Sequence, residues 1–109
     1  MVFMSLKITG SSGSEYEFTV YSRSQQFNAV GGVYLFTKNI PGTNKHQYVY
    51  LGITNDLSTR FDKHHKEKEI KEAGATHICI FREDDKSKRE KVERDLLSAI
   101  NTICNDILN

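Results

Sequence analysis

The chain has 109 residues, of which 38% are hydrophobic and 27% are charged, and its formal net charge is +1. This length is enough for one domain whose core needs no metal or disulfide support. The near-neutral charge argues against tight nucleic-acid binding by charge alone, because such proteins usually carry a large positive excess. No apolar run approaches the ~20 residues that span a bilayer. The N-terminus lacks the pattern of a signal peptide, so we expect a cytoplasmic protein.

Residues 5–21 predict a β-hairpin. Apolar and polar residues alternate over 15–20, the period-two pattern of a half-buried strand, and the turn-rich run GSSGS precedes them. Residues 31–38 and 46–54 predict two further strands, and Pro41-Gly42 between them is typical of a turn.

Aromatic residues are expected on one face of this second pair of strands. Alternation over 46–54 assigns one face to aliphatic side chains (Val49, Leu51 and Ile53) and the other to Tyr48, Tyr50 and Gly52. On the partner strand Val33 and Leu35 alternate with Tyr34 and Phe36. Tyr34 and Tyr50 should therefore lie near each other, where Gly32 and Gly52 leave room for a bulky group.

Two helices and one more strand complete the prediction. Asn55 or Asp56 caps a helix that carries Leu57 and Phe61 and ends near Gly74, and a short apolar strand follows at 76–82. The last helix is expected over roughly 87–104, with helical spacing of Val92, Leu96, Ala99, Ile100, Ile103 and Ile107. The fold class is α+β, with a mostly antiparallel sheet flanked by helices. Cys79 and Cys104 lack metal-ligand spacing, and we expect two reduced, buried thiols.

The strand motifs and the polar residues that follow them form a recognisable series. Gly32-Val33-Tyr34 in one strand is followed by Tyr50-Leu51-Gly52 in the next, and then come Thr54, Arg60, His64, Glu93 and Asn105. The series resembles the GIY-YIG endonuclease superfamily, with valine and leucine in place of the usual isoleucines. The resemblance covers about 31–105 and leaves 1–26 as an N-terminal hairpin extension of a single domain. Ile103-Cys104 stands where the family often has a proline, so we expect a different last turn.

The resemblance implies a role for most of these residues. Arg60 would hold the scissile phosphate, and Glu93 would be the sole protein ligand of a divalent metal, Mg²⁺ or in its place Mn²⁺, with waters completing the shell. Tyr34 or Tyr50 would activate or position the attacking water, and either remains open. His64 can orient a phosphate or pass a proton. The other residues expected to line or brace the substrate site are Gly32, Gly52, Thr54, Lys38, Lys63 and Asn105.

Each of these interpretations has a structural alternative. Glu93 borders the apolar stripe of its helix and needs a counter-charge, which a salt bridge would supply as well as a metal. Glu90, one turn earlier, is a rival ligand with the wrong spacing to Asn105. The run 60–71, which contains Lys63, is equally compatible with a DNA-contacting face and with an ordinary solvated helix face.

The function predicted from these residues is metal-dependent hydrolysis of DNA phosphodiester bonds by an endonuclease. The alternative is a catalytically inactive module of the same fold that binds nucleic acid or protein. Without a separate target-binding module, the domain would act loosely on branched or nonspecific DNA, depend on a partner protein, or form a homodimer, and the low net charge favours the last two. Roles in repair, in a mobile element or in restriction all fit. The nuclease interpretation requires Tyr34, Tyr50, Arg60, His64 and Glu93 to converge on one concave surface.

Overall fold

A computed structural model describes residues 4–43, 45–59 and 67–105. Five strands form one sheet: β1 (Met4–Thr9), β2 (Glu15–Ser22), β3 (Gly32–Asn39), β4 (His46–Thr54) and β5 (His77–Arg82). Helix α1 (Glu67–Glu72) lies between β4 and β5 in the chain, and helix α2 (Lys86–Leu97) follows β5. None of the helices described is long and apolar enough to cross a membrane.

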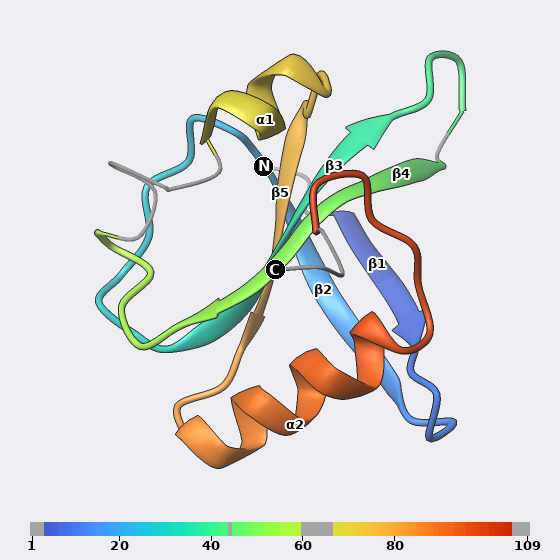
Figure 1. The fold of residues 1–109 in the computed structure, drawn as a ribbon. Coiled ribbons are helices and arrows are strands. Elements are labelled where there is room, and N and C mark those ends of the chain that lie inside the picture. Colours follow the sequence, from blue (N-terminus) through green and yellow to red (C-terminus); the bar gives the residue numbers. More distant parts are fainter. Residues whose placement is uncertain (1–3, 44, 60–66, 106–109) are drawn as a thin grey trace.

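The sheet is antiparallel throughout, with the strand order β1-β2-β5-β3-β4. The α+β class and the strands expected from the sequence are thereby confirmed. The N-terminal hairpin adds its second strand to the outer edge of β5, so it extends the sheet formed by β5, β3 and β4. In Figure 1 the sheet is curled, with α1 on one side of it and α2 on the other.

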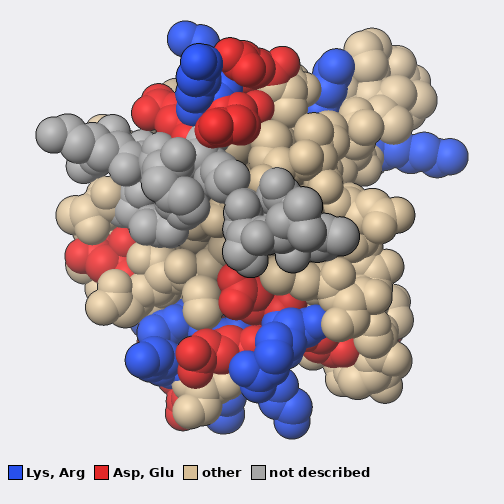
Figure 2. All heavy atoms as spheres, viewed as in Figure 1, with Lys and Arg blue, Asp and Glu red and all other residues tan. Residues whose placement is uncertain are grey.

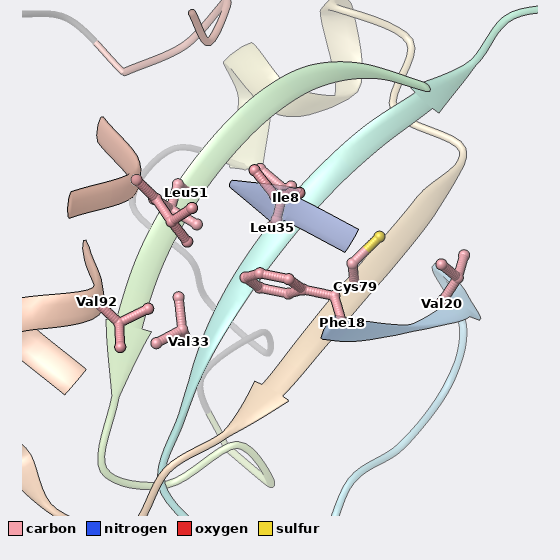
Figure 3. Close-up of a cluster of buried hydrophobic side chains, with 9 residues drawn as sticks. Ile8, Phe18, Val20, Val33, Leu35, Leu51, Cys79 and Val92 are labelled. Carbon is pink, nitrogen blue, oxygen red and sulfur yellow. The ribbon is translucent and has the colours of Figure 1, made fainter. Parts of the chain in front are cut away.

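Each face of the sheet has its own core. The face towards α2 buries mostly aliphatic side chains from the strands against Val92 and Leu96 of the helix, and Figure 3 shows most of this cluster: Ile8, Phe18, Val20, Val33, Leu35, Leu51 and Cys79. The opposite face buries a cluster with more aromatic residues under α1: Tyr34, Phe36, Val49, Leu57, Ile70, Ile78 and Ile80. Period-two alternation along β3 therefore separates the aliphatic side chains from the aromatic ones, as the sequence predicted.

A β-bulge changes the faces at the start of β4. Phe36 pairs with Tyr50 but Thr37 pairs with Tyr48, so Val49 is the extra residue on β4. Before the bulge the side chains point the other way, because one added residue reverses the alternation. Tyr48 consequently packs with the aliphatic core and Val49 with the aromatic one. The predicted faces are wrong for these two residues and correct for the rest of β4.

The first predicted helix is partly replaced by a turn. Residues 57–59 form a turn, and the Asp56 carboxylate accepts hydrogen bonds from the backbone N–H of Ser58 (2.9 Å) and from its hydroxyl. The described helix begins at Glu67, and Phe61 lies outside the described residues. Its predicted end is correct, since Gly74 follows it with a φ of +82°, a conformation that favours glycine.

The last helix is shorter than predicted. It ends at Leu97, where Ser98 caps it by donating its backbone N–H and its hydroxyl to the Arg94 carbonyl. The chain then turns along the outer edge of β4, where the N–H groups of Ile103 and Cys104 donate to β4 carbonyls at 3.1 and 2.7 Å. Continuing the helix would have left those carbonyls without these partners, so tertiary pairing overrides the helical spacing of the isoleucines.

The hairpin loop is tied to α2 through Asp95. The carboxylate of Asp95 accepts hydrogen bonds from the Ser12 backbone N–H (2.8 Å), the Ser12 hydroxyl (2.6 Å) and the Tyr16 hydroxyl (2.7 Å). These bonds lower the pKa of Asp95, with the Ser12 hydroxyl as the largest cause. A side chain at Gly10 would collide with this carboxylate. The extension and the helix that follows β5 therefore form one connected structure.

Candidate active site

The two motif tyrosines lie side by side on the α1 face of the sheet. Their rings are stacked, with centroids 6.1 Å apart and an interplanar angle of 25°. Tyr34 is fully buried, whereas Tyr50 is partly exposed. Tyr34 reaches across to Gly52, its partner on β4, so closely that a Cβ atom there would lie 2.5 Å from the tyrosine Cζ. The space beside Gly52 is thus filled by Tyr34, and it is not room for a ligand as the sequence analysis expected.

Gly32 and Thr54 pair with each other where β3 begins and β4 ends. A Cβ atom at Gly32 would lie 3.1 Å from the Leu57 side chain and 3.1 Å from the Phe81 carbonyl oxygen, so close packing explains this glycine. The Thr54 hydroxyl accepts from the Asp56 N–H at 3.1 Å. Both residues therefore shape the turn that leads from β4 towards Arg60.

The predicted cationic residues are divided between described and undescribed parts of the chain. Lys38 is exposed, and the end of its side chain runs beside Gly74 after α1. Arg60, Lys63 and His64 lie outside the described residues. The roles given to these residues stay predictions.

Glu93 is a partly buried carboxylate on the third turn of α2. Burial raises its pKa, and the neighbouring charge of Glu90 raises it further, while Arg94 lowers it by less. The one salt bridge between described residues joins Arg82 to Asp84, and no described residue hydrogen-bonds to Glu93. The salt bridge that was the structural alternative for Glu93 is therefore absent from the described part of the chain.

Such a carboxylate suits a hard divalent cation. The residue is only partly buried, it has no competing hydrogen bond from a described residue, and a nearby cation would offset the cost of its burial. Three or more His, Cys, Asp or Glu side chains do not converge on a metal position anywhere in the described residues. Among the described residues, the site can therefore offer a cation one carboxylate, which is fewer than the four protein ligands of a structural zinc site.

Asn105 braces the outer strand of the sheet. Its side-chain oxygen accepts from the Leu51 N–H at 2.7 Å, and its side-chain nitrogen donates to the Leu51 carbonyl at 2.9 Å. The amide thus takes the place of a neighbouring strand at the centre of the second motif. Asn105 was expected to line or brace the substrate site, and these bonds show it bracing the backbone of β4.

Arg89 is a structural residue that the sequence analysis missed. It is 6% exposed, and its Nη1 donates to the carbonyl oxygens of Glu83 and Asp84, both at 2.9 Å. A Cβ atom at Gly31 would collide with this guanidinium, so that glycine leaves its space. Arg89 therefore fixes the connection from β5 to the helix that carries Glu93. Its position three residues before Val92, on the buried stripe, was the available signal.

The described residues form two groups. Tyr34, Tyr50 and Gly52 meet on the α1 face, whereas Glu93 belongs to the helix that packs against the ends of β3 and β4 from the other side. On the face shown in Figure 2, lysines and arginines are mixed with acidic residues around both helices, and the described residues in this view form no continuous basic surface. The expected convergence of five residues, two of them outside the described part, remains a prediction.

Comparison with known proteins identifies a family for most of the chain. The family model described as GIY-YIG catalytic domain matches residues 30–102, from just before the first motif to just before Asn105. Neither the curated proteins nor the solved structures include a match to this chain. The matched region contains both tyrosines, the turn after β4 and Glu93, and it excludes the hairpin β1–β2. The chain therefore belongs to the GIY-YIG family of catalytic domains, which are nucleases that hydrolyse phosphodiester bonds.

Proposed function

We propose that the protein is a metal-dependent endonuclease that hydrolyses DNA phosphodiester bonds, with the cation held by Glu93. The observation that carries this proposal is the partly buried Glu93 carboxylate, which no described residue neutralises. An ionised group in that position costs stability unless a cation is bound there. Proteins retain such unfavourable groups at functional sites.

Three groups of this chain would divide the work of the reaction. Arg60 binds two oxygens of the scissile phosphate with its planar guanidinium, which fixes the phosphorus in place. Tyr34 or Tyr50 positions the attacking water or accepts a proton from it, and the two rings are stacked with their centroids 6.1 Å apart. When bound at Glu93, a divalent cation supplies Lewis-acid polarisation of a phosphoryl oxygen.

A nuclease domain acts on nucleic acid, and we propose DNA as the substrate form. The net charge of +1 and the mixed surface charge in Figure 2 support a binding mode that depends on a local site. We propose that a partner protein or a second copy of the chain supplies the remaining affinity. A place in repair, in a mobile element or in restriction is compatible with this activity.

DNA cleavage assays on the wild type and on variants of Glu93, Glu90 and Arg60 test the proposal. Supercoiled, single-stranded and branched DNA are incubated with Mg²⁺, Mn²⁺ or EDTA. Glu93→Gln and Arg60→Ala should abolish metal-dependent cleavage, whereas Glu90→Gln, one turn earlier on the same helix, should retain it. Loss of activity in Glu90→Gln alone would move the metal to Glu90. A folded wild-type chain that cuts none of these substrates would favour the inactive binding module.

Stability provides a second readout of Glu93 that does not depend on activity. Because the folded-state pKa is raised, the ionised carboxylate opposes folding above its ordinary pKa of 4.5. In EDTA, Glu93→Gln should therefore melt at the wild-type temperature or a few degrees higher, within about 1 kcal/mol. Mg²⁺ should stabilise the wild type and not the variant, since only the wild type binds it. Equal stabilisation of both by Mg²⁺ would place the cation elsewhere.

A further inference from the structure

The segment that joins the N-terminal hairpin to β3 lies along the α1 face of the sheet, which carries Tyr34 and Tyr50 and is called the tyrosine face below. In Figure 1 residues 23–31 run down the side of the molecule on which α1 and the turn after β4 also lie. The Leu57 N–H donates to the Val30 carbonyl at 2.9 Å, so the segment is joined to the turn that leads to Arg60. Tyr21 and Phe27 stack edge to face at 5.2 Å and pack on the aromatic core. The segment is therefore fixed beside the motif residues.

Arg23 stands at the end of a row of aromatic rings on this face. Its guanidinium carbon is 5.3 Å from the centroid of the Phe36 ring. The Phe36 ring meets Tyr34 edge to face at 5.9 Å, and Tyr34 stacks on Tyr50 at 6.1 Å. The cation–π contact holds the arginine in one place, which lowers the entropy lost when it binds a ligand.

The guanidinium remains available to an anion. Arg23 is exposed, and among the residues with a described position it has no ion pair. Residues 23–31 contain no acidic side chain, although the chain has 14 in all. Their exposed polar side chains are hydroxyls and amides, which often contact the DNA backbone: Ser24, Gln25, Gln26 and Asn28. This composition differs from the mixed charges around both helices.

We propose that Arg23 binds a backbone phosphate of the DNA that lies over the tyrosine face, and that residues 23–31 extend the substrate surface beyond the family domain. This inference rests on the proposed function and adds a residue that lies outside the matched region 30–102. The planar guanidinium binds phosphate oxygens while one of its faces stays on Phe36. Arg23 thereby supplies a local positive charge for the DNA, although the net charge of the chain is only +1.

Equilibrium binding of the full-length protein to a short fluorescent duplex tests this proposal. Anisotropy is measured with Ca²⁺ in place of Mg²⁺, at KCl concentrations from about 50 to 200 mM. Arg23→Ala should weaken binding about 3- to 10-fold and lower the slope of log Kd against log salt by about 0.9, the value for one phosphate contact. Arg23→Lys keeps the charge but not the planar fork, so it should retain the slope and bind with intermediate affinity.

A charge-matched control separates a specific contact from general electrostatics. Lys45 is exposed in the turn between β3 and β4, away from residues 23–31 in Figure 1. Lys45→Ala also removes one positive charge, but screening at these salt concentrations should limit its effect to about twofold. Thermal melting of both variants should match the wild type within a few degrees, which excludes a merely structural role for Arg23.

The binding and cleavage results together separate a failure of the Arg23 contact from a failure of the proposed nuclease function. Equal binding by Arg23→Ala and Lys45→Ala would overturn the phosphate contact even if the wild type cuts DNA. Binding that depends on Arg23 without any cleavage would support the contact and refute the nuclease activity. A wild type that neither binds nor cleaves DNA would overturn both.

Discussion

Replacing Gly52 by alanine should displace the buried ring of Tyr34 rather than obstruct a bound ligand. The added Cβ would lie 2.5 Å from Cζ and 3.0 Å from Cε2 of Tyr34, whereas ordinary contacts begin at 3.4 Å. The ring must therefore move by about 0.9 Å, the difference between 3.4 and 2.5 Å. It has no space in which to do so, because Tyr34 is fully buried between Phe36 and Tyr50.

The cost follows from this confinement. Overpacking a filled core costs about 1–3 kcal/mol, and a rigid ring held on both sides belongs to the upper part of that range. We expect a loss of about 2–3 kcal/mol, which lowers the melting temperature of a domain of this size by roughly 10–20 °C. Cleavage should also fall at temperatures where the variant is folded, since the displaced ring would carry a proposed water-positioning hydroxyl with it.

A double-mutant cycle isolates the clash. Thermal and urea unfolding are followed by circular dichroism for Gly52→Ala, Tyr34→Leu and the double variant, all in EDTA. With Tyr34→Leu the colliding atoms are gone, so adding Gly52→Ala should cost less than about 0.5 kcal/mol. An equal cost of Gly52→Ala in both backgrounds would refute the argument. So would a wild-type melting temperature combined with weaker DNA binding, which would mean that the space serves a ligand.

Two further predictions concern the contacts that join the N-terminal hairpin to α2 and the C-terminal segment to β4. Asp95→Asn should lower the melting temperature at neutral pH, because the folded-state pKa of Asp95 is lowered by its bonds to Ser12 and Tyr16. That stabilisation is present above the unfolded pKa of about 3.9 and is lost as the pH falls through the folded value, so melting curves of the two proteins should converge in acid; a gap that does not depend on pH would contradict it. Asn105→Ala should cost about 1–3 kcal/mol in urea unfolding, since both backbone groups of Leu51 lose a partner, and an unchanged midpoint would show that water replaces the amide.

The strands and the family were predictable because their signals are local. Side-chain alternation and a short apolar run are local patterns, and they predicted the ends of β3, β4 and β5 to within one residue. The motif tyrosines were expected to be neighbours because β3 and β4 form a hairpin, and their rings do stack. The family match over 30–102 confirms the identification made from the motif residues.

The errors occurred where contacts distant in sequence decide the local conformation. Tyr48 and Val49 lie on the faces opposite to those predicted because of a single bulge, which a periodic pattern does not reveal. The last helix stops at Leu97 although isoleucines continue at helical spacing, because the following residues satisfy carbonyl groups on β4. The burial of Arg89 depends on space left by Gly31, 58 positions earlier in the chain (89 minus 31).

Short-range spacing and residue type were enough to predict the strands, the proximity of Tyr34 to Tyr50 and the membership in a nuclease family. The packed structure was needed to show that Gly52 makes room for Tyr34 and that Asn105 braces Leu51. It also shows that Glu93 forms no ion pair with a described residue. It also placed Arg23 beside the aromatic row. The physical reason is that burial, collision and charge pairing depend on distances between segments, and these are set only when the sheet and helices pack together.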